Sequence, residues 1–130
     1  MAAPELRKIM LVEDDPDIQV VAEMALGAVG GYEVKMCSDG REALAAVDDY
    51  APDLILLDVM MPDMDGPTTF GELRRRPERA DTPVIFMTAK VQPDEVHGYQ
   101  QLGALGVIAK PFDPMTLASE IEALWRRAYE

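Results

Sequence analysis

The sequence predicts an α/β protein built on a doubly wound, five-stranded parallel sheet with helices on both faces. Short apolar runs alternate five times with segments that are long enough to form helices. Two of these runs, Ile55–Leu57 and Val84–Met87, are continuously apolar, which is typical of strands covered on both faces. The chain has 130 residues, 48% of them hydrophobic, which is enough for one domain with its own core.

The strands are predicted from apolar runs that end at polar residues. The first run, Ile9–Val12, meets three acids, and the third and fourth strands contain the two continuous runs described above. The second and fifth strands follow the same alternation of strand and helix along the chain. The predicted strands are Lys8–Glu13, Glu33–Cys37, Leu54–Asp58, Val84–Thr88 and Val107–Ala109.

The helices are predicted from segment length, apolar period and the residues at their ends. Gly30-Gly31 provides a stop for the first helix. The last helix shows the period most clearly, because Leu117, Ile121 and Leu124 fall on one face after Asp113 as N-cap. The predicted helices are Pro16–Ala28, Gly40–Tyr50, Gly66–Arg76, Pro93–Leu102 and Asp113–Tyr129.

The charge and composition disfavour several kinds of partner. Asp and Glu number 24 against 12 Lys and Arg, for a net charge of −12, so we expect no direct nucleic-acid binding and no binding to anionic membranes. No apolar stretch approaches the roughly 20 residues of a membrane helix, and the first apolar run is too short for a signal peptide. We therefore expect a cytoplasmic protein.

One cysteine and one histidine exclude an intrachain disulfide and most zinc sites.

Polar side chains follow four of the predicted strands at their carboxyl ends. Glu13 and Asp14 follow the first strand, Asp58 ends the third, Thr88 ends the fourth and Lys110 follows the fifth. Ligands of open parallel sheets bind at this edge. A single acid after a strand is usually a turn former or a helix cap. Four convergent elements with a lysine among the acids are much harder to explain as caps.

The chemistry of this set is that of phosphoryl transfer. Three carboxylates in one crevice repel one another and need protons or a cation, and hard oxygen ligands suit Mg²⁺. Lys110 adds a positive charge, Thr88 adds a hydroxyl donor, and Asp58 at the end of the central strand is the best nucleophile. These residues predict a metal-assisted phosphoryl site, and they leave open whether the phosphoryl group stays or leaves.

Four segments, in this order and at suitable spacing, resemble the receiver domain of bacterial two-component response regulators (the CheY-like class). They are Leu11–Asp15 (LVEDD), Leu57–Gly66 (LDVMMPDMDG), Thr88-Ala89 and Lys110–Phe112 (KPF). The MPDMDG stretch after an aspartate is highly specific, and the likeness covers nearly the whole chain. The resemblance implies a flavodoxin-like (βα)5 fold with strand order 2-1-3-4-5.

The resemblance also implies a role for each matching acid. Asp58 would accept a phosphoryl group from the phosphohistidine of a sensor histidine kinase or a histidine phosphotransfer protein. Glu13 and Asp14 would be the acid pair of the metal site. The ligands of Mg²⁺ would be Asp14, Asp58 and the main-chain carbonyl of Met60.

The remaining matching residues would respond to the phosphoryl group. Thr88 would hydrogen-bond one of its oxygens, Lys110 would pair with its charge, and the Lys110-Pro111 peptide bond would be cis. The face built from the fourth helix, fifth strand and last helix would then shift its population and control binding of a protein target. The family often has an aromatic residue whose ring rotates at the position of Val107, whereas valine has no ring to rotate.

We therefore expect a single receiver domain over residues 1–130, with its core at about 8–129 and no output domain in this chain. It would be a phosphoacceptor switch that assists its own phosphorylation and dephosphorylation, rather than an enzyme. Two alternatives stay open. One is a metal-dependent hydrolase that forms an aspartyl phosphate from a small substrate, although no insertion is long enough for a substrate cap. The other is a receiver-like scaffold without phosphorylation, against which the intact residue set argues.

Overall fold

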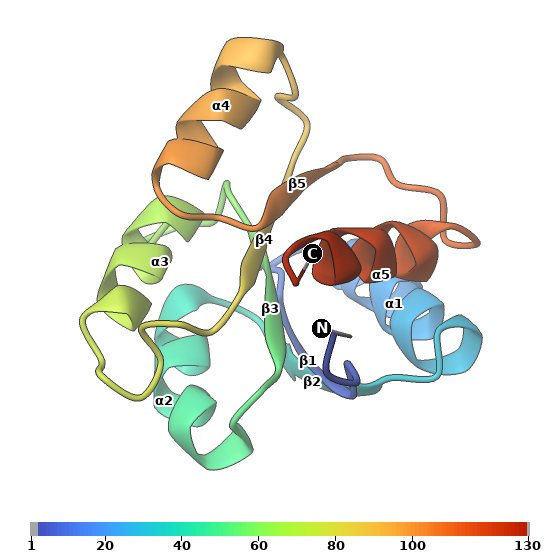
Figure 1. The fold of residues 1–130 in the computed structure, drawn as a ribbon, viewed down its shortest axis with the longest axis horizontal. Helices are drawn as coiled ribbons and strands as arrows, with labels where there is room; N and C mark the ends of the chain where they lie inside the picture. Colours follow the sequence, from blue (N-terminus) through green and yellow to red (C-terminus); the bar gives the residue numbers. More distant parts are fainter. Residues whose placement is uncertain (1–2, 130) are drawn as a thin grey trace.

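The protein is built on one parallel sheet whose five strands lie in the order β2-β1-β3-β4-β5 (Figure 1). The structure is a computed structural model, and it describes residues 3–129. The predicted doubly wound fold and the strand order are both confirmed. The strands are β1 (Lys8–Val12), β2 (Glu33–Cys37), β3 (Leu54–Asp58), β4 (Val84–Thr88) and β5 (Gly106–Ala109).

Helices cover both faces of the sheet (Figure 1). One face carries α1 (Pro16–Met24), its π-helical continuation η1 (Ala25–Val29) and α5 (Leu117–Arg127). The other face carries α2 (Gly40–Tyr50), α3 (Gly66–Arg74) and α4 (Pro93–Gln101). Within residues 3–129, no helix combines the length and the apolar composition that a bilayer crossing requires.

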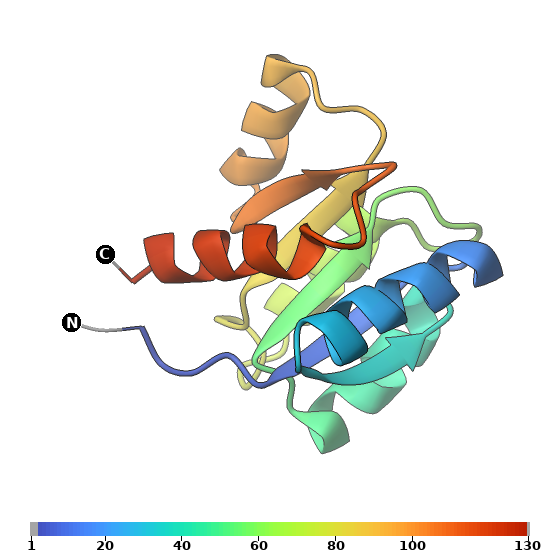
Figure 2. The same ribbon diagram turned by 90° about the vertical axis from the view of Figure 1, so that its right-hand side faces the viewer.

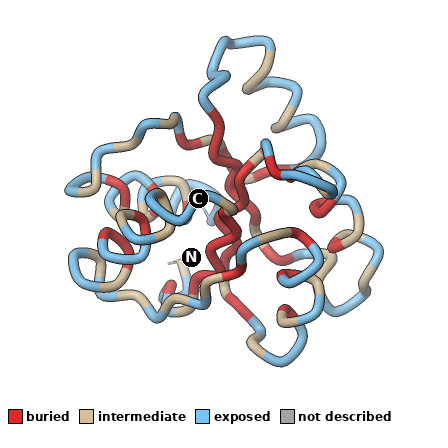
Figure 3. The backbone as a smooth tube through the Cα atoms, turned by 180° about the vertical axis from the view of Figure 1, so that it is seen from behind, coloured by how far each residue is buried: buried red, intermediate tan, exposed pale blue. Residues whose placement is uncertain are grey.

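The continuous apolar runs arise because adjacent strand residues enter different cores. In β3, Leu54 and Leu56 pack in the cluster beneath α1 and α5, whereas Ile55 and Leu57 pack in the cluster beneath α2 and α3. The central strands are consequently buried on both sides, as the red core of the backbone in Figure 3 shows. Burial of both faces removes the usual apolar–polar alternation of a strand.

The last helix begins later than the sequence predicts. α5 starts at Leu117 and not at Asp113. The Asp113 carboxylate accepts a hydrogen bond from the N–H of Met115 at 2.8 Å, and its carbonyl accepts from the N–H groups of Thr116 and Leu117. Asp113 thus closes a turn before the helix, because its short side chain bonds the N–H two residues further on and its carbonyl bonds the next two N–H groups. The other predicted boundaries agree with the structure to within two residues.

The first helix ends at the predicted glycines, but through a wider turn. The N–H of Gly30 donates to the carbonyl of Ala25 at 3.0 Å, which is the i→i+5 bond of a π-helix. Gly31 follows with a φ of 77°, in the left-handed region that glycine adopts without a steric penalty. The N–H of Tyr32 then bonds the carbonyl of Leu26 and completes the stop.

The N-terminal segment of the described chain runs below α5 and lies near the C-terminal end of that helix (Figure 2). The indole N–H of Trp125 donates to the carbonyl of Pro4 at 2.7 Å, and Leu6 is buried in the core beneath α5. The N–H groups of Arg7 and Lys8 both donate to the carboxylate of Asp53. These contacts lie at the amino ends of the strands, on the edge of the sheet opposite the acids.

Candidate functional site

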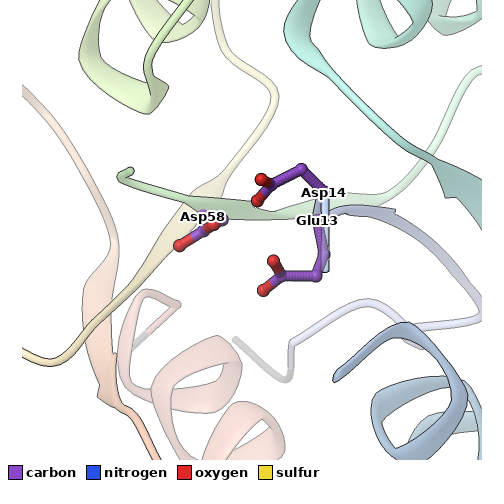
Figure 4. Close-up of side chains that lie close together, drawn as sticks. All are labelled: Glu13, Asp14 and Asp58. Atoms are coloured by element: carbon purple, nitrogen blue, oxygen red, sulfur yellow. The ribbon is translucent and has the colours of Figure 1, made fainter. Parts of the chain in front are cut away.

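Three carboxylates meet at the carboxyl edge of the sheet (Figure 4). Glu13 and Asp14 directly follow β1, and Asp58 ends β3. The pairing of Val12 with Leu57 brings these strand ends level with each other. One carboxylate oxygen from each of the three acids lies within 4.8 Å of the others. Glu13 and Asp58 are buried, so Asp14 is the acid of this set that reaches solvent.

Lys110 joins two of these acids. Its ammonium nitrogen Nζ lies 2.9 Å from Oε1 of Glu13 and 3.0 Å from Oδ1 of Asp58. The main-chain N–H of Lys110 donates to the carbonyl of Thr88, which fixes the start of the β5–α5 loop. The Lys110-Pro111 peptide bond is cis, which confirms the expectation from the family resemblance. The structure thus brings the predicted lysine to the predicted acids.

Glu13 is held by the protein at every polar group. Its second carboxylate oxygen, Oε2, accepts the N–H of Asp15 at 3.1 Å. Its main-chain N–H donates to the carbonyl of Cys37, and its own carbonyl accepts from the side chain of Gln19. Glu13 is therefore a fixed, buried anchor, whereas Asp14 and Asp58 present carboxylate oxygens to the crevice.

Burial dominates the acid–base behaviour of the cluster. It raises the pKa of Glu13 to about 7, although hydrogen bonds from Lys110 and the Asp15 N–H act in the opposite direction. Burial also raises the pKa of Asp58, against the hydrogen bond and charge of Lys110. Burial lowers the pKa of Lys110, but its hydrogen bonds to Glu13 and Asp58 outweigh this effect and raise it. The site therefore favours a bound positive charge.

This arrangement predicts that the metal-free protein loses stability as the pH rises. Because the pKa of Glu13 is raised from 4.5 to about 7 on folding, the native state binds more protons than the unfolded state between these values. The contribution of Glu13 to the free energy of unfolding should fall from pH 4.5 to pH 7. Urea unfolding of the metal-free wild type and of metal-free Glu13→Gln between pH 4.5 and pH 7 measures this contribution to the free energy of unfolding. The wild type should lose stability relative to the variant as pH rises, and parallel profiles would contradict the expectation.

Thr88 and Met60 flank the acids. Thr88 is buried at the end of β4, and its hydroxyl accepts the N–H of Lys90 at 3.0 Å. A hydroxyl can accept and donate at once, so Thr88 retains the ability to donate to a ligand. Met60 lies in the loop that follows β3, and the residue is 69% exposed. The structure thus places all six predicted site residues on neighbouring strand ends and loops.

The donor set fits a divalent cation of the Mg²⁺ type. The carboxylates come from two different strand ends, and their oxygens are already within 4.8 Å of one another. The site contains three carboxyl groups and the ammonium group of Lys110, so it carries a net negative charge when the acids are ionised. Mg²⁺ prefers such oxygen ligands and commonly keeps coordinated waters.

An apolar groove of about 460 Å³, which the sequence does not predict, opens beside Lys110. Ile18 and Val21 of α1 form one wall, and Pro111 and Phe112 of the β5–α5 loop form the other. Both α1 residues are half-buried. The spacing of three between Ile18 and Val21, which places them on one helix face, was the sequence signal for the first wall. The second wall comes from a loop far along the chain, so the groove could not be predicted from this spacing.

A flavodoxin-like sheet that gathers acids, a threonine and a lysine at its carboxyl edge is the architecture of a phosphoacceptor switch domain. Residues 9–122 match the family model described as "Response regulator receiver domain". The chain belongs to the response regulator receiver family, which confirms the resemblance found in the sequence. Receiver domains are phosphoacceptor switches, and they generally use Mg²⁺.

Similar proteins include transcriptional regulators and solved receiver domains. The chain is 37% identical over 121 residues to the DNA-binding dual master transcriptional regulator RpaA of Synechocystis sp., covering 92% of this chain and 49% of that protein. It is 40% identical over 125 residues to the transcriptional regulatory protein CpxR of Klebsiella pneumoniae, covering 95% and 51%. The chain thus spans about half the length of these curated relatives.

Among solved structures, the chemotaxis response regulator CheY4 of Vibrio cholerae matches with a TM-score of 0.84 and 32% identity, covering 92% of this chain and 99% of that one. The receiver domain of the Francisella response regulator 1452 matches with a TM-score of 0.82 and 26% identity, covering 94% and 98%. Both matches extend over almost the entire fold described above.

Proposed function

We propose that Asp58 of this chain accepts a phosphoryl group from a phosphohistidine and so switches the binding surface of the domain. The observation that carries this proposal is the placement of the Asp58 carboxylate. It ends the central strand, contacts Lys110 at 3.0 Å and lies within reach of Glu13 and Asp14. This is a nucleophile with a cation beside it and an acid pair that fits a metal.

In the proposed reaction, a carboxylate oxygen of Asp58 forms a bond to phosphorus as the bond between phosphorus and the donor imidazole nitrogen breaks. The imidazole keeps the electron pair of that bond and takes a proton from solvent. Lys110 stabilises the charge on the phosphoryl oxygens, and Thr88 donates a hydrogen bond to one of them. Mg²⁺, when held by Asp14, Asp58 and the main-chain carbonyl of Met60 beside Glu13, supplies further charge neutralisation. The same groups would assist hydrolysis of the acyl phosphate and reset the switch.

The groove beside Lys110 supports a protein as the phosphoryl donor. Its walls from α1 and the β5–α5 loop are apolar and border the lysine that contacts Asp58. A sensor histidine kinase or a histidine phosphotransfer protein that packs an apolar helix here would bring its phosphohistidine to Asp58. Apolar contacts would then supply affinity next to the reacting atoms.

The weak attachment of α4 supports the α4-β5-α5 face as the output surface. None of the residues of α4, all of which are described, is buried, and its Gln92 N-cap makes no side-chain hydrogen bond. The Tyr99 ring packs on Phe86 of β4 at a centroid distance of 5.1 Å, and Phe86 pairs with Val107 in the sheet. A movement of Thr88 on phosphorylation would reach α4 through Phe86 of β4 and Tyr99. This route needs no aromatic side chain at position 107.

The names of the relatives bear on the downstream partner. RpaA is described as DNA-binding, and CpxR as a transcriptional regulatory protein. We propose that residues 1–130 form one receiver domain that controls a protein target. DNA-binding proteins are among the targets that such a domain can control. The net charge of −12 disfavours direct contact of this domain with nucleic acid.

The decisive experiment is the intact mass of the protein after incubation with acetyl phosphate, with and without Mg²⁺. We expect one added phosphoryl group on the wild type in the presence of Mg²⁺ and none on Asp58→Asn. Asp63→Asn is the matched control, because Asp63 is an exposed aspartate of the same loop whose φ of 66° asparagine tolerates. It should be phosphorylated like the wild type.

Other outcomes would favour the alternatives. Steady release of phosphate from small phosphorylated substrates, lost in Asp58→Asn, would indicate a hydrolase. Neither an adduct nor released phosphate would indicate a scaffold, and an adduct that persists in Asp58→Asn would assign the acceptor elsewhere.

A further inference from the structure

Gln19 makes two hydrogen bonds that join three parts of the molecule at the edge of the site. It lies on α1, and its carboxamide nitrogen Nε2 donates to the carbonyl of Glu13 at 2.6 Å. The same nitrogen donates to the hydroxyl oxygen of Ser38 at 3.2 Å. An amide nitrogen carries two hydrogens, so it can serve both acceptors. Neither bond is within α1, and the site described above does not include Gln19.

The first bond holds the peptide from which Asp14 extends. The carbonyl of Glu13 belongs to the planar peptide unit that also contains the N–H and the Cα of Asp14. The N–H and the carboxylate of Glu13 are already fixed by Cys37, Asp15 and Lys110. The bond from Gln19 fixes the remaining polar group of Glu13 and so sets the direction in which the Asp14 side chain leaves the main chain.

The second bond ties Gln19 to the start of α2. The N–H of Ser38 donates to the carboxylate of Glu42 at 3.0 Å, and the carboxylate of Asp39 accepts the N–H of Glu42 at 2.8 Å. This capping arrangement holds Ser38 in place. Gln19 is thus held by Ser38 on the side away from Glu13, and Ser38 is exposed and hydrogen-bonds Glu42 rather than the three acids.

We propose that Gln19 is a positioning residue for the cation site: it orients Asp14 through the Glu13 carbonyl without touching the cation. The inference rests on the proposed function, because that function supplies the cation. Partners that orient metal ligands typically change metal affinity by about 10–100-fold when they are removed. The hydrogen bonds of Gln19 go to Glu13 and Ser38 rather than to Asp58 or Lys110, so it should affect cation binding more than the phosphoryl-transfer step.

The test compares Gln19→Met with Ser38→Ala. Methionine has the length and helix preference of glutamine but cannot donate, so it removes both bonds. Ser38→Ala removes only the bond on the far side. Mg²⁺ binding to the metal-free proteins is measured by calorimetry. We expect the dissociation constant of Gln19→Met to rise at least about tenfold, and that of Ser38→Ala to stay within about threefold of the wild type.

A second readout separates positioning from general damage. The rate of phosphorylation by acetyl phosphate is measured as a function of Mg²⁺ concentration. The Gln19→Met protein should need more Mg²⁺ but reach nearly the wild-type rate at saturation. Mg²⁺ affinity within about threefold of the wild type, or an equal loss in Ser38→Ala, would overturn the inference. A wild type that binds no Mg²⁺ would overturn the cation site and this inference together. The intact-mass experiment with acetyl phosphate tests independently whether Asp58 is the phosphoryl acceptor.

Discussion

Replacing Lys110 with methionine should slow phosphoryl transfer to Asp58 by about 10²–10³-fold, the usual cost of removing a donor that faces developing negative charge. The ammonium group lies 3.0 Å from Asp58 and 2.9 Å from Glu13, and it is largely enclosed by protein. Electrostatic interactions are strong in such a site because water screens them poorly. The rate of acyl phosphate formation, measured by rapid acid quench at saturating Mg²⁺, checks this prediction.

The control for this variant is Lys35→Met. Lys35 is an exposed lysine of β2, and its removal changes the net charge of the protein by the same amount as removal of Lys110. Lys35→Met should retain the wild-type rate. A Lys110→Met protein that is phosphorylated as fast as Lys35→Met would show that Lys110 pairs with the acids only to stabilise the fold.

The sheet and the acid cluster were predictable because both depend on chain topology. A strand buried on both faces must be apolar along its length, and β3 and β4 satisfy that condition directly. Once the strands are parallel, the residues that follow them share one edge, so Asp14, Asp58 and Thr88 could be brought together from the sequence alone. Local errors in the helix boundaries do not change this result.

The helix ends that the sequence did not predict depend on which of several local hydrogen bonds forms. The π-helical end of the first helix is completed by the N–H of Tyr32, which bonds the carbonyl of Leu26. The late start of α5 follows from the turn that Asp113 closes. The end of the first helix and the start of α5 were both predicted from local residue preferences. These preferences cannot distinguish between competing hydrogen bonds of similar strength.

The same limit applies at the site. The sequence identified Glu13 as one of a pair of acids, but only the structure shows that its carboxylate is occupied by Lys110 and the Asp15 N–H. No sequence pattern distinguishes Gln19 from any other polar residue of α1. Its two partners lie 6 and 19 residues away along the chain, in different loops.

Gly66→Ala should destabilise the protein by at least about 2 kcal/mol, because a methyl group at this position has no space. Gly66 begins α3 directly after its N-cap, Asp65. A Cβ atom there would collide with the carbonyl oxygen of Asp58 and lie 2.9 Å from the Cα of Val59. Both neighbours are main-chain atoms of β3 and of the loop that follows it, so they cannot move aside as a flexible side chain would.

Gly71→Ala in the same helix provides the contrast. Nothing lies within 4 Å of the Cβ position at Gly71, which is exposed in the interior of α3. Alanine is the better helix former there, so this variant should gain about 0.5–1 kcal/mol. Urea unfolding of both variants measures the difference, and equal stability would show that α3 can withdraw from Asp58 without cost. The glycine of the MPDMDG stretch thus has a physical explanation: α3 can begin against the main chain of Asp58 only where residue 66 has no side chain.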